Sequence, residues 1–205
     1  MSRNAVRATR LLLCAIAISL TAGLTAAQAP APASGRVQFA SEPRTLADFE
    51  LEDQDGRAMK LSALRGKPVL VFFGFAHCPD VCPSTLQILK SAHASKDKAM
   101  RRVQVIMISI DGERDSPSAM KAYLAPLSKD FIGLTGEPAK VQAITEQFQA
   151  LFFKGPPLNA AGDYNMQHTS QIYLVDSKGR LRATFFEPPV ALLVKVTSQI
   201  AVEKG

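Results

Sequence analysis

The sequence predicts an α/β fold in which a central mixed β-sheet is flanked by helices. The continuous apolar run of residues 69–75 has the composition of a buried parallel strand, and the mainly apolar residues 103–110 predict a second buried strand. A segment with helical character follows each run, and this alternation of strands and helices is typical of α/β proteins. Residues 170–186 then predict a strand, a turn and a second strand, before a terminal helix.

Turn residues and helix-starting residues mark the other elements. Residues 49–61 predict an N-terminal β-hairpin with its turn at Asp55 and Gly56. Ser116 followed by Pro117 has the pattern of a helix N-cap and an N1 proline. We expect helices over residues 84–100, 116–127, 137–152 and 188–204, a short turn or helical piece over 61–68, and a short strand over 131–134.

The first 40 residues have the layout of an export segment followed by a linker. Three of the first ten residues are arginine, and residues 11–27 form an apolar run. A cleaved signal peptide and a retained membrane anchor both fit residues 1–29. Residues 30–40 predict a flexible linker, and residues 41–205 the folded domain. We expect that domain to be exported, either free in a periplasm or facing it from an inner-membrane anchor.

Composition excludes several classes of protein. The chain has 205 residues, of which 47% are hydrophobic and 20% charged, so it is neither wholly disordered nor a multi-span membrane protein. Its net charge is +6, from 24 basic and 18 acidic residues. Without the three N-terminal arginines, 21 basic residues remain and the net charge is +3. No basic stripe interleaved with aromatic residues follows, so we predict no binding to nucleic acid.

Cysteine is scarce, and the position of each cysteine is therefore informative. Cys14 lies in the N-terminal apolar run, whereas Cys78 and Cys82 lie where the first buried strand meets a helix. A helix N-terminus lowers the pKa of nearby thiols, and Asp80 could cap this helix. A four-residue offset brings the two sulfurs to one side. Such a pair can form a stable disulfide, exchange disulfides or bind a soft metal ion.

A strand that ends in a cysteine pair at the start of a helix, together with a late hairpin, predicts a thioredoxin-like sheet. A metal site would need a third ligand. His77 directly precedes Cys78 and is expected to point away, and His93 lies in a polar helical stretch. His168, in a loop that leads into a strand, is a ligand candidate or a simple hydrogen-bonding residue, and Met166 is a soft ligand or core filler.

Three segments, GFAHCPDVCP, ISIDGERDSP and DYNMQHTSQIYLVDSKG, resemble the signature segments of the Sco/SenC family. Proteins of that family are membrane-tethered, thioredoxin-fold copper chaperones that help assemble the binuclear copper centre of cytochrome c oxidase. The resemblance runs from about Phe49 to the last helix. It implies that Cys78, Cys82 and His168 bind copper, as Cu(I) or Cu(II), and that the partner is a copper-accepting oxidase subunit or another copper chaperone.

This sequence departs from the family pattern at two positions. Gln167 stands where the family usually has Asp, and Gly112 where it usually has Pro. Gln167 removes a negative charge close to the expected site. The matching segment from Asp111 to Asp115 is expected to be a capped, solvated turn.

A different function remains open for the same cysteines. Cys78 and Cys82 could form a redox-active disulfide whose reduction controls copper binding. A thiol–disulfide oxidoreductase that keeps the cysteines of a copper-accepting partner reduced is the alternative, and it would not need His168. A thiol peroxidase and a domain with a purely structural disulfide are further alternatives. The favoured function is a metallochaperone, for which no catalytic residue is assigned.

Overall fold

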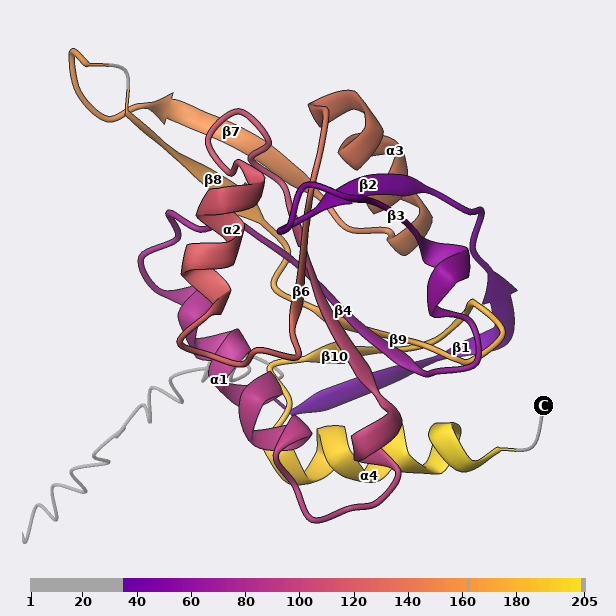
Figure 1. Ribbon diagram of the computed structural model, residues 1–205. Helices are drawn as coiled ribbons and strands as arrows, with labels where there is room; N and C mark the ends of the chain where they lie inside the picture. The colour runs from indigo at the N-terminus through magenta and orange to yellow at the C-terminus, as the bar shows by residue number, and fades with distance from the viewer. Residues whose placement is uncertain (1–34, 162, 204–205) are drawn as a thin grey trace, which may run out of the picture. The chain divides into compact units, whose positions relative to one another are not determined.

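A computed structural model describes residues 35–161 and 163–203, and the predicted signal or anchor segment lies outside these residues. An eight-stranded mixed sheet has the order β1-β10-β9-β4-β5-β6-β2-β3, with β4, β5 and β6 parallel (Figure 1). A separate two-stranded sheet contains β7 and β8. The strands are β1 (Arg36–Thr45), β2 (Glu50–Asp53), β3 (Ala58–Lys60), β4 (Val69–Gly74), β5 (Gln104–Ser109), β6 (Ile132–Thr135), β7 (Phe152–Pro157), β8 (Tyr164–His168), β9 (Ile172–Val175) and β10 (Arg180–Phe186).

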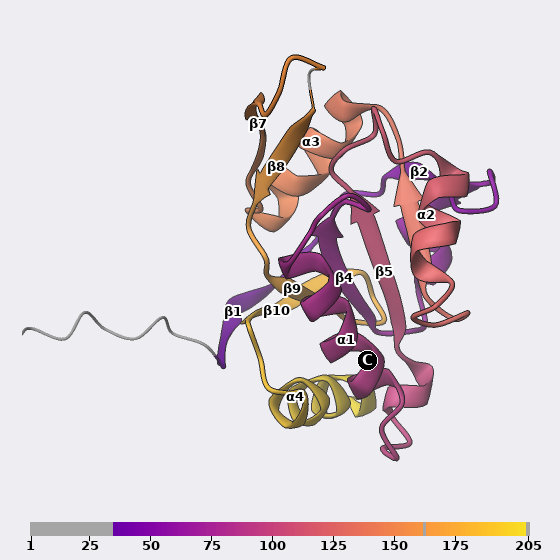
Figure 2. The same cartoon turned by 90° about the vertical axis from the view of Figure 1, so that its left-hand side faces the viewer.

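Helices flank the large sheet, so the predicted α/β, thioredoxin-like architecture is confirmed. The α-helices are α1 (Val81–His93), α2 (Pro117–Leu124), α3 (Pro138–Phe148) and α4 (Val190–Val202), and the 3₁₀ helices are η1 (Leu61–Leu64) and η2 (Met100–Arg102). Helices α1 and α4 pack against each other. Both views place α4 and the β7–β8 hairpin at opposite ends of the domain (Figures 1 and 2). Within the described residues, none of the helices combines the length and the apolar character that crossing a membrane requires.

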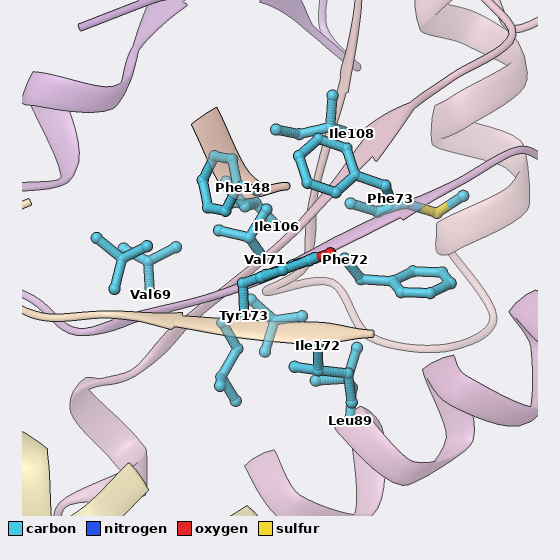
Figure 3. Packing of buried hydrophobic residues seen from close by; sticks show 14 of the residues in the cluster. Val69, Val71, Phe72, Phe73, Leu89, Ile106, Ile108, Phe148, Ile172 and Tyr173 are labelled. Atoms are coloured by element: carbon cyan, nitrogen blue, oxygen red, sulfur yellow. The ribbon is translucent and has the colours of Figure 1, made fainter. Parts of the chain in front are cut away.

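The core lies on both faces of β4, which explains why every residue of that strand is buried. On one face, the ring of Phe148 from α3 lies 5.2 Å from those of Phe73 and Tyr173, measured between centroids. Leu89 of α1 lies on the other side of the strands, next to Ile172 (Figure 3). The two layers of helices therefore shield β4 completely from water.

Most of the predicted elements are present. The N-terminal hairpin is formed by β2 and β3, and its turn contains Gly56 at a positive φ of 78°. Ser116 caps α2, because its side chain accepts a hydrogen bond from the backbone N–H of Ala119, and Pro117 follows at N1. The late strand–turn–strand unit is the β9–β10 hairpin.

Three features differ from the sequence predictions. Residues 36–40 belong to β1 and not to a linker, because β1 pairs with β10 along the sheet edge. The helix predicted over 84–100 ends at His93, and the side chain of Asp97 then accepts a hydrogen bond from Ala99 N–H in a turn that competes with the helix. The β7–β8 hairpin is not predicted, and His168 ends a strand of it and does not lie in a loop.

Removing the ring of Phe148 should strongly destabilise the domain. Phe148→Ala leaves a cavity beside Phe73 and Tyr173, and such truncations cost about 3–5 kcal/mol. Urea unfolding followed by circular dichroism measures the change in the free energy of unfolding. Phe153→Ala is the matched control, because Phe153 is 64% exposed and surface changes usually cost about 0.5 kcal/mol or less. Equal losses in the two variants would contradict the described core.

Candidate metal centre

The sulfur of Cys82 packs against the end of the central strand β4. Cys82 lies in the first turn of α1 and is 0% exposed. A Cβ atom added to Gly74, the last residue of β4, would lie 3.0 Å from Cys82 Sγ and 2.7 Å from the ring of Phe72. The sulfur therefore occupies space that a side chain at residue 74 would fill. Gly74 is not among the predicted site residues, although a glycine within an apolar strand signals close approach of another group.

Cys78 caps the helix that carries Cys82. Its Sγ accepts a hydrogen bond from the backbone N–H of Cys82 at 3.4 Å, and this donor belongs to a first turn in which N–H groups have no partner within the helix. The prediction that Asp80 caps the helix is wrong for its side chain, since Asp80 is the N-cap residue but its carboxylate makes no capping hydrogen bond. Pro83, also in the first turn, has no N–H to satisfy.

His168 presents one ring nitrogen to Cys82. Its Nδ1 donates a hydrogen bond to the carbonyl oxygen of Thr169 at 3.0 Å, so Nδ1 carries the proton. Nε2 keeps its lone pair and lies 3.5 Å from Cys82 Sγ. The rings of Phe72 and Phe75 contact the imidazole edge to face, with centroids at 6.2 Å and 5.9 Å. These contacts fix the orientation of the ring in the way that is usual for metal-binding histidines.

The three predicted ligands come together in space. One ligand atom each from Cys78, Cys82 and His168 lies within 4.8 Å of the other two. Both cysteines are free thiols. Cys78 and His168 line a hollow of about 230 Å³, so the group can be reached from solvent on one side. Two sulfurs and one imidazole form a soft donor set, which suits copper and zinc far better than magnesium or calcium.

Burial controls the protonation of this group. It raises the pKa of the Cys82 thiol, because a thiolate at this position would lose its hydration. The sequence predicts a lowered pKa from the helix N-terminus, and for Cys82 that prediction is wrong because desolvation outweighs the helix dipole. Burial also lowers the pKa of His168, although the hydrogen bond to Thr169 acts in the opposite direction. In the absence of metal, the site therefore holds a neutral thiol at Cys82 beside a neutral imidazole.

Comparison with known proteins identifies the family of this chain. Residues 38–197 match the protein-family model described as SCO1/SenC. The chain belongs to this family. An SCO2-like protein of Rickettsia conorii is 31% identical over 156 residues, which are 76% of this chain and 76% of that protein.

Two solved structures from the SCO1/SenC family are similar to this one. Bradyrhizobium japonicum ScoI with copper bound is 36% identical, has a TM-score of 0.69, and the match covers 76% of this chain and 99% of that one. Yeast Sco1 with copper bound is 28% identical, has a TM-score of 0.70, and the match covers 79% of this chain and 91% of that one.

The structure directs His77 and His93 to groups other than the cysteines, and it places Met166 next to the site. Nδ1 of the exposed His77 side chain lies 3.3 Å from Asp115 Oδ1, so this histidine points elsewhere, as predicted. His93 is half-buried and not fully solvated, because its ring packs against Phe131 with centroids 5.9 Å apart. Met166 is buried and lines the hollow beside the site.

The two departures from the SCO1/SenC pattern have different surroundings. A Cβ atom at Gly112 would lie 2.2 Å from the carbonyl oxygen of Gly136. Glycine is therefore required at residue 112 by the close approach of a neighbouring loop. Gln167 is exposed at the rim of the hollow, next to His168 in β8. The first departure is explained by local packing, and the second changes the charge of the rim.

The segment from Asp111 to Asp115 is not the solvated turn that the sequence predicts, because both aspartates are buried. Oδ2 of Asp115 accepts hydrogen bonds from Ser109 Oγ at 2.7 Å and from the backbone N–H of Ala76 at 2.9 Å. Ala76 lies two residues before Cys78. Asp115 thus fixes the backbone that leads from β4 to the cysteine pair.

Alkylation should distinguish the two thiols. Cys78 is partly exposed, whereas Cys82 is buried and its pKa is raised. Iodoacetamide should therefore modify Cys78 about tenfold faster or more near neutral pH, as measured by peptide mass spectrometry of the reduced, metal-free protein. In Cys78→Ser, Cys82 should still react slowly with iodoacetamide. This variant shows that burial slows the reaction, and not a prior modification of Cys78. Comparable rates for the two cysteines would contradict the burial of Cys82.

Proposed function

We propose that this protein is a copper metallochaperone that delivers copper to the binuclear copper centre of cytochrome c oxidase during assembly of that enzyme. Cys78 and Cys82 bind the ion as thiolates, and Nε2 of His168 completes the site. The observation that carries the proposal is the convergence of these three ligand atoms within 4.8 Å of one another. Membership of the SCO1/SenC family and the copper-bound relatives support the choice of metal.

The donor set also bears on the valence of the ion. Soft thiolates select Cu(I), and the added imidazole makes Cu(II) tolerable as well. Copper replaces the proton of the Cys82 thiol, so that binding turns a buried neutral thiol into a metal thiolate without leaving an uncompensated buried charge. We therefore expect Cu(I) to be the tighter-bound form.

Delivery proceeds by ligand exchange with the thiolates of the partner, which is a copper-accepting oxidase subunit or another copper chaperone. Each Cu–S bond that breaks in this protein is replaced by one that forms in the partner, so the ion keeps its valence. A disulfide between Cys78 and Cys82 would remove both sulfur ligands, and reduction of the pair would therefore control binding. We expect this exchange to take place outside the cytoplasm, because the chain begins with the pattern of an export segment.

A thiol–disulfide oxidoreductase acting on the cysteines of the partner is the second candidate. The closeness of the two sulfurs favours it. It gives no role to the neutral imidazole that faces Cys82 at 3.5 Å, and burial works against a reactive thiolate at that cysteine. The copper function accounts for all three side chains and is preferred for that reason.

Titration of the reduced protein with Cu(I), in competition with a coloured chelator, tests the site. We expect binding of one ion per chain. Cys78→Ser and Cys82→Ser should each abolish tight binding. His168→Ala should lower the affinity by about 10–100-fold, since one of three ligands is lost. His93→Ala is the matched control, because His93 packs against Phe131 and not against the cysteines, and its affinity should equal that of the wild type.

The outcomes separate the two candidate functions. Equal Cu(I) affinity in the wild type and in His168→Ala would contradict the three-ligand site. Fast reduction of a model disulfide by the dithiol form of this protein, unaffected by His168→Ala and without Cu(I) binding, would favour the oxidoreductase. Delivery itself is tested by mixing the copper-loaded protein with the apo copper-centre domain of an oxidase subunit and measuring copper in each after separation. Copper that stays on this protein would contradict delivery to that partner.

A further inference from the structure

The β7–β8 hairpin carries His168, yet within the described residues it is not hydrogen-bonded to the large sheet. Strands β7 and β8 pair only with each other in a two-stranded sheet. A two-stranded hairpin is at best marginally stable by itself in water. The position of His168 relative to the cysteines therefore depends on contacts between the hairpin and the rest of the domain.

One group of side chains joins the hairpin to the β5–α2 loop. The hydroxyl of Tyr164, the first residue of β8, donates to Oδ1 of Asp111 at 2.8 Å. Nε of Arg114 donates to the other oxygen of the same carboxylate at 2.6 Å, and its Nη1 donates to the carbonyl oxygen of Tyr164 at 2.9 Å. The guanidinium also lies 3.7 Å from the centroid of the Tyr164 ring. We call Asp111, Arg114 and Tyr164 the hairpin clamp.

The aspartates of this loop are not free to bind a metal ion of their own. Ligand atoms of His77, Asp111 and Asp115 lie within 4.8 Å of one another, which is close enough for such a site. Both oxygens of Asp111 already accept hydrogen bonds, one of them from the cationic Arg114. Oδ2 of Asp115 accepts two more hydrogen bonds. The guanidinium of Arg114 would repel a metal cation here. The cluster therefore serves to hold the loop and the hairpin together.

The clamp reaches the copper ligands through the ring of Phe75. The guanidinium carbon of Arg114 lies 6.0 Å from the centroid of that ring, and the ring of Phe75 contacts the imidazole of His168 at 85°, with centroids 5.9 Å apart. The loop that holds the hairpin also holds the strand end before Cys78 through Asp115. One loop therefore touches both halves of the site.

We propose that Asp111, Arg114 and Tyr164 are positioning residues that hold His168 against the cysteine pair. The inference rests on the proposed copper function and specifies how the third ligand is kept in place. Loss of the clamp leaves Cys78 and Cys82 untouched. It lets the hairpin, and with it Nε2, move away from the ion, so copper binding should fall toward the level of a two-cysteine site.

Two conservative variants test the clamp. Tyr164→Phe removes the hydrogen bond to Asp111 and keeps the ring beneath Arg114. Arg114→Lys replaces the planar guanidinium, which joins Asp111 to the backbone of Tyr164, with an ammonium group that acts as a point charge. Each should lower the Cu(I) affinity by about tenfold, as is usual for groups that orient a metal ligand. With Cu(II), each should also shift the sulfur-to-copper charge-transfer band toward that of His168→Ala.

Arg180→Lys is the matched control. Arg180 donates to the buried Asp176 at 2.8 Å in the β9–β10 turn, an Asp–Arg pair of the same kind at the other end of β9 from His168. This variant should lose as much thermal stability as Arg114→Lys and keep the wild-type copper affinity and spectrum. Equal copper losses in Arg114→Lys and Arg180→Lys would assign the effect to general destabilisation and overturn the proposal.

A double-mutant cycle separates this inference from the copper function. When His168→Ala is already present, adding Tyr164→Phe should cause no further loss of affinity, because the clamp acts only through that histidine. A full additional tenfold loss would overturn the clamp. If both clamp variants keep the wild-type Cu(I) affinity while His168→Ala binds more weakly, the clamp proposal is overturned. The three-ligand copper site is then still supported. Absence of Cu(I) binding by the wild-type protein would overturn the proposed function itself.

Discussion

Burial of the Cys82 sulfur at the end of β4 is the constraint on which the site depends. The sulfur fits because residue 74 has no side chain, and it can be buried because it is neutral. A bare thiolate in this position would be costly, whereas a thiol that donates to Nε2 of His168, or a sulfur bound to a soft cation, is compensated. At this residue, the packing of the core therefore also limits the partners that the sulfur can have.

The burial also makes the two cysteines unequal. Cys78 caps α1 through its sulfur and lines the hollow, while Cys82 is fully enclosed. In the proposed copper site, a ligand from a partner would approach the ion from the side of Cys78 and His168, which line the hollow. Under the proposed function, exchange by way of the partly exposed Cys78 sulfur would leave the buried Cys82 sulfur as the last bond to the ion and would give transfer a defined order. Symmetric exposure of both sulfurs would give no such order.

The sequence predicts the central elements well because their signals are local. A continuous apolar run identifies β4 and a mainly apolar segment identifies β5, while prolines mark the starts of α2, α3 and α4, with a serine before α2. The spacing of Cys78 and Cys82 also predicts their proximity. The position of His168 could not be derived in this way, because it depends on contacts between residues far apart in the sequence, such as Tyr164 and Asp111, which are 53 residues apart. The pKa of Cys82 is mispredicted because the helix terminus is visible in the sequence and the depth of burial is not.

Gln167 lies near the ligand group but does not belong to it. Its side chain lies on the exposed rim, opposite Phe153 in the hairpin register, and takes no part in the ligand group. Replacing a carboxylate by an amide there leaves the three donors unchanged. It does remove a charge from a rim where Val81 is also exposed, beside the exposed Phe153 that pairs with Gln167. Charges on a rim act mainly on the rate and selectivity of association, and less on the bonds at the centre. We therefore expect this departure from the SCO1/SenC pattern to influence which partner docks over the hollow, and the affinity of the proposed copper site to depend on the buried sulfur and on the histidine that faces it.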